Sequence, residues 1–259
     1  MSTVRMLLGS AAAVVFGCLV SGAAFGVVGG VADGTVHPYV GAAELPVTGG
    51  FELCSGSLVS ATVFVTAAHC FPDGSTVQVS FDPDVTAGSG AVWHSGTVHV
   101  EPGFCLGCGQ GLPGADTNDL AVVVLDAPGA PQSRYAELPD TGLVDELANN
   151  QRLDVLGYGV QSFQPPKTPV AFGTRQIAES KVIGGGGELG AEFLKHSSDP
   201  GQGQGGQCFG DSGGPDLLQG TDTMVAVTSF GSGNPICNGA AYSERLDRPS
   251  ALAFIRGFE

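Results

Sequence analysis

One eight-residue stretch, Cys208-Phe209-Gly210-Asp211-Ser212-Gly213-Gly214-Pro215, constrains this chain more than any other part of its sequence. It places a serine hydroxyl in a turn lined by glycines, with an acid directly before it. Two further segments stand upstream, Thr66-Ala67-Ala68-His69-Cys70 and Asn118-Asp119-Leu120-Ala121-Val122. A base, an acid and a hydroxyl therefore follow one another along the chain, each in a distinctive local setting.

These three residue types form a known chemical set. A serine hydroxyl is a weak nucleophile at neutral pH, so it needs a base within hydrogen-bond reach and that base needs an orienting partner. Histidine suits the base because its pKa lies near neutrality. The order and the neighbourhoods of His69, Asp119 and Ser212 resemble the chymotrypsin-like (trypsin-fold) serine proteases, from about Val27 to the C-terminus. The composition, rich in alanine, glycine and valine, suggests a secreted, bacterial-type member.

The resemblance implies a role for each residue. Ser212 is expected to be the nucleophile, His69 the general base and then the general acid, and Asp119 the residue that orients the imidazole. The backbone N–H groups of Gly210 and Ser212 are expected to form the oxyanion hole. The expected activity is that of a serine endopeptidase that cleaves protein or peptide substrates through an acyl-enzyme, with no cofactor.

Two other interpretations of the serine motif were weighed. Gly210 to Gly214 also fits the Gly-x-Ser-x-Gly pattern of α/β-hydrolases, in which the base follows the nucleophile. The five histidines, however, all precede Ser212, so that esterase interpretation lacks a base: His37, His69, His94, His99 and His196. The remaining alternative is a catalytically silent protease homologue that acts as a secreted binding module.

The N-terminal residues 1–26 are typical of an export signal. Arg5 precedes an apolar run from Met6 to Val20, and small residues follow at a plausible cleavage point. A membrane anchor is the alternative, because the apolar and small residues extend to Val28. The sequence Val27-Val28-Gly29-Gly30 favours cleavage, since the resemblance implies a zymogen whose freed Val27 amine pairs with Asp211.

The cysteines fit an exported chain. Seven cysteines become six when Cys18 is removed with the signal, and six cysteines allow 15 pairings. The resemblance implies disulfides Cys54–Cys70 and Cys208–Cys237, which leaves Cys105 and Cys108 to each other. A lone Cys-x-x-Cys can also be a redox or metal site, but in an exported chain a structural link is expected.

Charge and histidine spacing exclude several partners. The formal net charge is −15 and no basic run offsets it, which argues against nucleic acid and against stable membrane association. The spacing of His94 and His99 matches no zinc motif, so no metal is expected. His37 and His196 are expected to be surface or loop residues. A secreted monomer is expected, with protein inhibitors as further partners.

The expected fold is all-β. Short valine- and threonine-rich runs separated by glycine, proline and aspartate indicate many strands and few helices. The resemblance implies two antiparallel six-stranded β-barrels with the active site in the cleft between them, one over residues 27–140 and one over residues 141–259. Strands are expected over several runs, among them Ser57–Thr66, and helices over Leu143–Asn149 and Pro249–Phe258.

The same resemblance predicts an uncharged substrate pocket. The pocket floor lies six residues before the nucleophile in this family, at Gly206, where no acid stands to select arginine or lysine. The other expected pocket residues are Gln207, Ser229, Phe230, Gly231 and Ala240. This set predicts apolar or medium-sized uncharged side chains at P1, the substrate residue before the cleaved bond.

Overall fold

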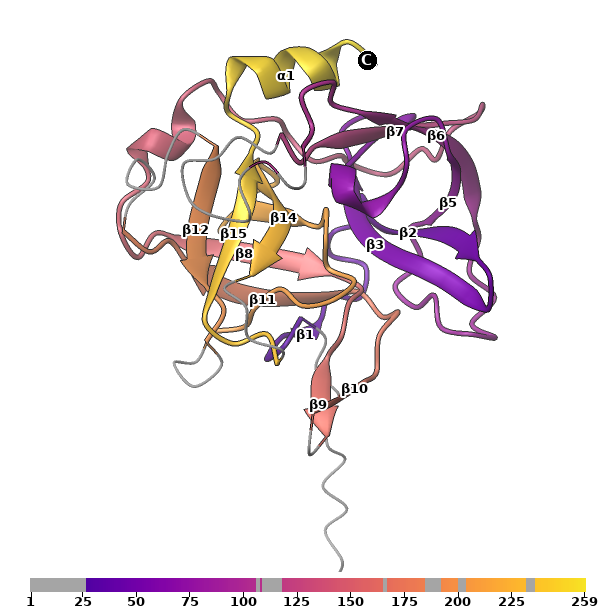
Figure 1. Cartoon of the computed structure of the whole chain (residues 1–259), viewed down its shortest axis with the longest axis horizontal. Coiled ribbons are helices and arrows are strands. Elements are labelled where there is room, and N and C mark those ends of the chain that lie inside the picture. The colour runs from indigo at the N-terminus through magenta and orange to yellow at the C-terminus, as the bar shows by residue number, and fades with distance from the viewer. Residues whose placement is uncertain are drawn as a thin grey trace, which may run out of the picture.

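The computed structural model describes most of the chain after the expected signal. The expected signal peptide, residues 1–26, lies outside the described residues, which are 27–105, 108, 118–164, 167–184, 192–199, 204–231 and 236–259. Two β bodies lie side by side, with strands β2 to β7 in one and most later strands in the other (Figure 1). The chain is therefore mostly β, as expected.

The first body is a closed six-stranded barrel. Its strands are antiparallel, in the order β2 (Val40–Val47), β3 (Gly50–Leu58), β4 (Val63–Thr66), β7 (Ala121–Leu125), β6 (His94–Val100) and β5 (Thr76–Ser80). Glycines allow the interior to fill with aromatic rings: a Cβ at Gly56 would lie 2.5 Å from the ring of Phe64. Residues 57–66, expected as one strand, instead contain the end of β3, a turn and β4.

The second body is a seven-stranded sheet. Its order is β1 (Val31–Ala32), β11 (Gln176–Lys181), β8 (Arg152–Gly157), β13 (Pro215–Leu218), β14 (Met224–Gly231), β15 (Ala240–Arg245) and β12 (Phe193–Ser197). One antiparallel bridge joins Val182, just after β11, to His196 of β12. The structure thus describes one closed barrel and this sheet, where two barrels were expected. The short strands β9 (Ser162–Gln164) and β10 (Thr168–Val170) form a separate hairpin.

Helix is confined to short segments. The C-terminal helix α1 (Pro249–Arg256) starts with proline, which suits a first helical position, and buries Leu252 and Ile255. The segment expected as a helix near residue 143 is only a 3₁₀ turn, η2 (Leu143–Glu146).

Buried polar side chains join the two bodies beside the serine loop. Ser55 of β3 donates its N–H to the carbonyl of Ser212 (2.8 Å) and its hydroxyl to the carbonyl of Gly210 (2.9 Å). Arg175, only 1% exposed, donates to the carbonyls of Val40 (2.8 Å) and Phe81 (3.0 Å) in the barrel. The barrel therefore fixes the position of a loop that belongs to the sheet.

Candidate active site

The imidazole of His69 is positioned by the barrel. His69 lies in the 3₁₀ turn η1 (Ala68–Cys70) that follows β4, and the Cys54–Cys70 disulfide ties this turn to β3. Asp119 comes just before β7, and Thr66 at the end of β4 pairs with Ala121 at the start of β7. Because these strands are paired antiparallel neighbours, their termini bring His69 and Asp119 to the same edge.

Asp119 holds this imidazole at two points. Its Oδ2 lies 2.7 Å from His69 Nδ1, and its Oδ1 accepts the backbone N–H of His69 at 2.9 Å. Burial of the ring opposes its charged form, but the hydrogen bond and the charge of Asp119 outweigh it and raise the pKa of His69. Burial would raise the pKa of Asp119, but hydrogen bonds from His69 and Ser229 and the imidazole charge lower it. The carboxylate thus favours a proton on Nδ1, which leaves Nε2 free to act as a base.

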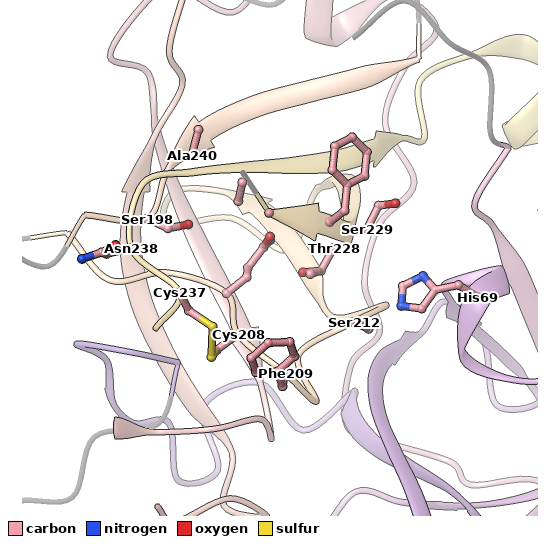
Figure 2. A pocket seen from close by; sticks show the side chains of 14 residues that line it. His69, Ser198, Cys208, Phe209, Ser212, Thr228, Ser229, Cys237, Asn238 and Ala240 are labelled. Atoms are coloured by element: carbon pink, nitrogen blue, oxygen red, sulfur yellow. A yellow bond between two sulfur atoms is a disulfide. The ribbon is translucent and has the colours of Figure 1, made fainter. Parts of the chain in front are cut away.

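Ser212 lies beside this imidazole at the edge of a cavity (Figure 2). It is half-buried in a turn whose flanking glycines, Gly210 (φ +94°) and Gly213 (φ +78°), adopt conformations that favour glycine. A Cβ at Gly213 would also lie 2.6 Å from the backbone nitrogen of Ala67. The glycines therefore let the serine loop approach the segment that carries His69.

The Phe209–Gly210 peptide has a defined direction. The carbonyl of Phe209 accepts the N–H of Val160 at 2.8 Å. Because the C=O and N–H of a trans peptide point in opposite directions, the N–H of Gly210 points away from Val160. Among the described residues, neither this N–H nor that of Ser212 has a hydrogen-bond acceptor. Two backbone donors beside the hydroxyl are therefore available to a ligand.

Asp211 is a buried acid with no cation beside it in the described part of the chain. Burial raises its pKa to about 7, although its carboxylate accepts the N–H groups of Gly159 and Cys208, both at 2.8 Å, which lower it. The side chain of Val27 is also buried, packed with Val155 and Ala178. The next residue, Val28, forms an isolated antiparallel bridge with Gly206.

A cavity of about 440 Å³ opens beside His69 and Ser212. Five of the six residues expected in the substrate pocket line it: Gln207, Ser229, Phe230, Gly231 and Ala240. Gly206 does not. A Cβ there would lie 2.6 Å from both Cα and Oγ of Ser198, so Ser198 occupies the space that a side chain at 206 would need. Ser198 lines the cavity in its place, at the end far from Ser212 (Figure 2).

Sequence reasoning missed several residues of this region. The Ser229 hydroxyl donates a hydrogen bond to Asp119. The two residues lie far apart in the sequence, so no pattern of neighbouring residues predicts this bond. His37 and His196, expected to be surface or loop residues, are both buried. His37 does lie in a loop, between β1 and β2, whereas strand β12 carries His196 fully into the sheet. The disulfides join the pairs that the resemblance implied: Cys54–Cys70, Cys105–Cys108 and Cys208–Cys237.

One group of metal-ligand residue types gathers in the described chain, formed by Cys54, His69 and Cys70. Both sulfur atoms belong to a disulfide, and the imidazole is hydrogen-bonded to Asp119. Metals bind cysteine as the thiolate, so these sulfurs offer no ligand.

Comparison with known proteins identifies the family. The sequence model of the family described as Trypsin matches residues 27–244. The chain belongs to the trypsin family. Among relatives, Trypsin beta of Drosophila erecta is 27% identical over 212 residues, which cover 81% of this chain and 78% of that protein. Trypsin delta of the same fly is 26% identical over 216 residues, with the same coverage of both chains. Because these trypsins come from an insect, they give no support to a bacterial-type member.

Solved structures agree with this trypsin-family fold. HL collagenase superposes with a TM-score of 0.70 at 20% identity and covers 89% of this chain and 97% of its own. Human heparin binding protein gives a TM-score of 0.65 at 23% identity, with coverage of 89% and 95%. Such identities bear on the fold alone. In the described residues, no helix has the length and apolar character needed to cross a membrane.

Proposed function

We propose that this chain is a secreted serine endopeptidase with His69, Asp119 and Ser212 as its catalytic triad. The observation that carries the proposal is the imidazole held by Asp119, next to Ser212 and two unoccupied backbone donors. Membership of the trypsin family implies a hydrolase acting on protein or peptide substrates.

The reaction follows from this arrangement. His69 Nε2 takes the Ser212 proton as Oγ attacks the substrate carbonyl, and the N–H groups of Gly210 and Ser212 stabilise the developing oxyanion. Removal of one such donor typically costs about 3–4 kcal/mol of transition-state stabilisation. His69 then protonates the leaving amine, which leaves an acyl group on Ser212 that water removes by the same steps in reverse.

We also propose that cleavage before Val27 completes the site. A free Val27 ammonium would supply the cation that buried Asp211 lacks, and their pairing would hold the loop from Cys208 to Ser212 in place. The buried Val27 side chain and the raised pKa of Asp211 support this pairing. N-terminal sequencing of the active secreted protein should find Val27 first, and a start well away from Val27 would contradict the pair.

The remaining expectations belong to the same proposal. Residues 1–26 are removed on export, residues 27–140 and 141–259 form the two units, and the second sheet is a barrel closed between β11 and β12. The enzyme acts as a monomer, is open to protein inhibitors, and prefers uncharged P1 residues, because the described residues that line the cavity include no aspartate, glutamate, lysine or arginine.

A serine-directed fluorophosphonate tests the function. The processed protein should be labelled at Ser212, and a Ser212→Ala variant should not. The alternative, a silent homologue that acts as a binding module, predicts a correctly processed and folded protein that ignores the reagent. Cleavage of a peptide library by the same preparation then measures the hydrolytic activity directly.

A further inference from the structure

The cavity is lined by two buried polar side chains whose oxygens lack partners in the described part of the chain. Gln207 and Ser198 both line the cavity and are only 8% and 3% exposed. Gln207 Oε1 and Ser198 Oγ have no hydrogen-bond partner in the described part of the chain. Leaving such a group buried and unpaired costs about 1–3 kcal/mol. A pocket meant only for apolar side chains has no use for either group.

The orientation of the Gln207 amide is fixed from behind. Its Nε2 donates to Asp216 Oδ1 on β13 and to Ser243 Oγ on β15 (3.3 Å). A carboxylate only accepts hydrogen bonds, so the reversed amide would place Oε1 against another acceptor. Gln207 therefore keeps its two donors for the protein interior and leaves Oε1 as the acceptor without a partner.

A buried histidine lies behind Ser243, the second acceptor of the Gln207 amide. His196 Nε2 lies 3.2 Å from Ser243 Oγ, and His196 Nδ1 lies 2.7 Å from the hydroxyl of Ser180. That hydroxyl donates its proton to the carbonyl of Ser197, so it accepts from Nδ1. The chain Ser180, His196, Ser243 and Gln207 is thus a connected network that ends at the cavity.

From this network we infer that the cavity selects a substrate side chain ending in a primary amide, glutamine above all. The inference rests on the proposed function and names its substrate class. The substrate NH₂ would donate to Gln207 Oε1, and the substrate carbonyl would accept the hydroxyl proton of Ser198. Asp216 and His196 act as positioning residues, because they orient Gln207 without touching the substrate.

Other P1 side chains satisfy these groups less well. Methionine and leucine fill the space but leave both oxygens unpaired, and a site built to hydrogen-bond its substrate rejects such analogues strongly. An ionised glutamate carboxylate has no N–H or O–H group to donate to Gln207 Oε1. Lysine or arginine brings a charge into a cavity that no acidic side chain of the described residues lines, and burying an unpaired charge is costly.

Peptide substrates that differ only at P1 test the inference. With the processed enzyme, we expect kcat/KM for glutamine to exceed that for methionine, a side chain of similar length, by about 10–100-fold. Glutamate, leucine and lysine should all fall below glutamine. Ser212 labelling by fluorophosphonate is measured on the same preparation.

Variants test whether the hydrogen-bond network behind Gln207 causes the preference for glutamine at P1. Gln207→Met should bring the glutamine-to-methionine ratio to about one or below, mainly through loss on the glutamine substrate, and Ser198→Ala should reduce it in part. Gln219→Met, the same change at an exposed turn glutamine, should leave the ratio unchanged. Asp216→Leu should lower the ratio while the methionine substrate changes less than about threefold, and Asp216→Asn, which keeps an acceptor, should restore part of it.

The outcomes separate the two proposals. An enzyme that is labelled at Ser212 but cleaves after methionine, leucine or lysine as well as after glutamine overturns this inference and leaves the proposed function intact. A folded, processed protein that is neither labelled nor active overturns both. Should Asp216→Leu fail to fold, the wild-type preference and Gln207→Met still decide the question.

Discussion

The two halves of the candidate site differ in how completely their polar groups are paired. In the half built by the barrel, Asp119 accepts hydrogen bonds from the backbone N–H of His69 and from Ser229, and its Oδ2 lies 2.7 Å from His69 Nδ1. In the half built by the sheet, the described residues offer no partner to the N–H groups of the serine loop or to Gln207 Oε1, and no cation to Asp211. The base is therefore oriented by the fold itself, whereas on the sheet side the proposed substrate and the proposed free amine of Val27 would supply the missing partners.

The largest expected effect comes from changing Asp119, the acid that pairs with the imidazole in the half built by the barrel. Asp119→Asn should lower kcat by about 10⁴-fold, because an amide favours the wrong imidazole tautomer for a base facing Ser212. Thermal unfolding should change far less. Asp126→Asn, at the exposed opposite end of β7, is the matched control and should keep full activity. Equal rates for the two variants would remove Asp119 from the mechanism.

The next effect concerns the unpaired acid. In the uncut chain, burial raises the pKa of Asp211 to about 7, against about 3.9 for an unfolded aspartate. The folded state then binds more protons than the unfolded state between these pH values, so its free energy of unfolding should fall by about 4 kcal/mol as pH rises from about 4 to about 7. Asp211→Asn should flatten this dependence, as measured by chemical denaturation of uncut Ser212→Ala protein.

Cleavage before Val27 should move this loss of stability to higher pH. Pairing with Asp211 should raise the pKa of the new amine above its free value of about 7.7–8.0. Its stabilising contribution is complete below the free value and is lost as pH rises through the raised one. Activity of the processed enzyme should therefore decline in strongly alkaline buffer. A profile that stays flat there, or identical denaturation curves for cut and uncut protein, would contradict the pair.

A smaller effect tests the direction of the Phe209–Gly210 peptide. A Cβ at Gly159 would lie 2.6 Å from both the carbonyl oxygen of Phe209 and the backbone nitrogen of Asp211. Gly159→Ala should therefore displace the donor of Gly210 and lower kcat by about 10–1,000-fold, the scale of losing one oxyanion donor. Gly50→Ala, whose Cβ would meet nothing within 4 Å, should behave as wild type in the same assay.

The smallest expected effect concerns the disulfides, which we expect to contribute unequally to stability and to the site. Cys105 and Cys108 are three residues apart, whereas Cys54 and Cys70 are sixteen apart. On loop-closure entropy, replacing the first pair by serine should cost about 1–2 kcal/mol and replacing the second about 3 kcal/mol. Denaturant titration measures both, and activity should fall only for the second, which holds the turn of His69. Equal losses would show that loop length does not govern these links.

Local motifs allowed part of this molecule to be predicted. The settings of His69, Asp119 and Ser212 are encoded by adjacent residues, so the sequence predicted that the fold would gather them in the cleft between two β units. The C-terminal helix was also predicted, because its apolar spacing is local. The helix expected near Leu143 was wrong, since only a 3₁₀ turn forms there.

Long-range pairing explains the rest. Ser198 reaches the cavity only because β12 pairs with β15, and it fills space left by a glycine at 206. The contact between His196 and Asp216 joins β12 to β13, which are not neighbours in the sheet order. No pattern within one segment encodes these long-range contacts. The pocket floor therefore could not be predicted from the sequence, whereas the serine loop could.

Pre-steady-state hydrolysis of an activated ester by processed protein is the decisive experiment for an acyl-enzyme on Ser212. We expect a rapid burst of about one product molecule per enzyme, with the acyl group found on Ser212 by mass spectrometry after acid quench. The burst should vanish in Ser212→Ala. Steady hydrolysis without a burst, with the acyl group on another residue or on none, would show that Ser212 is not the nucleophile.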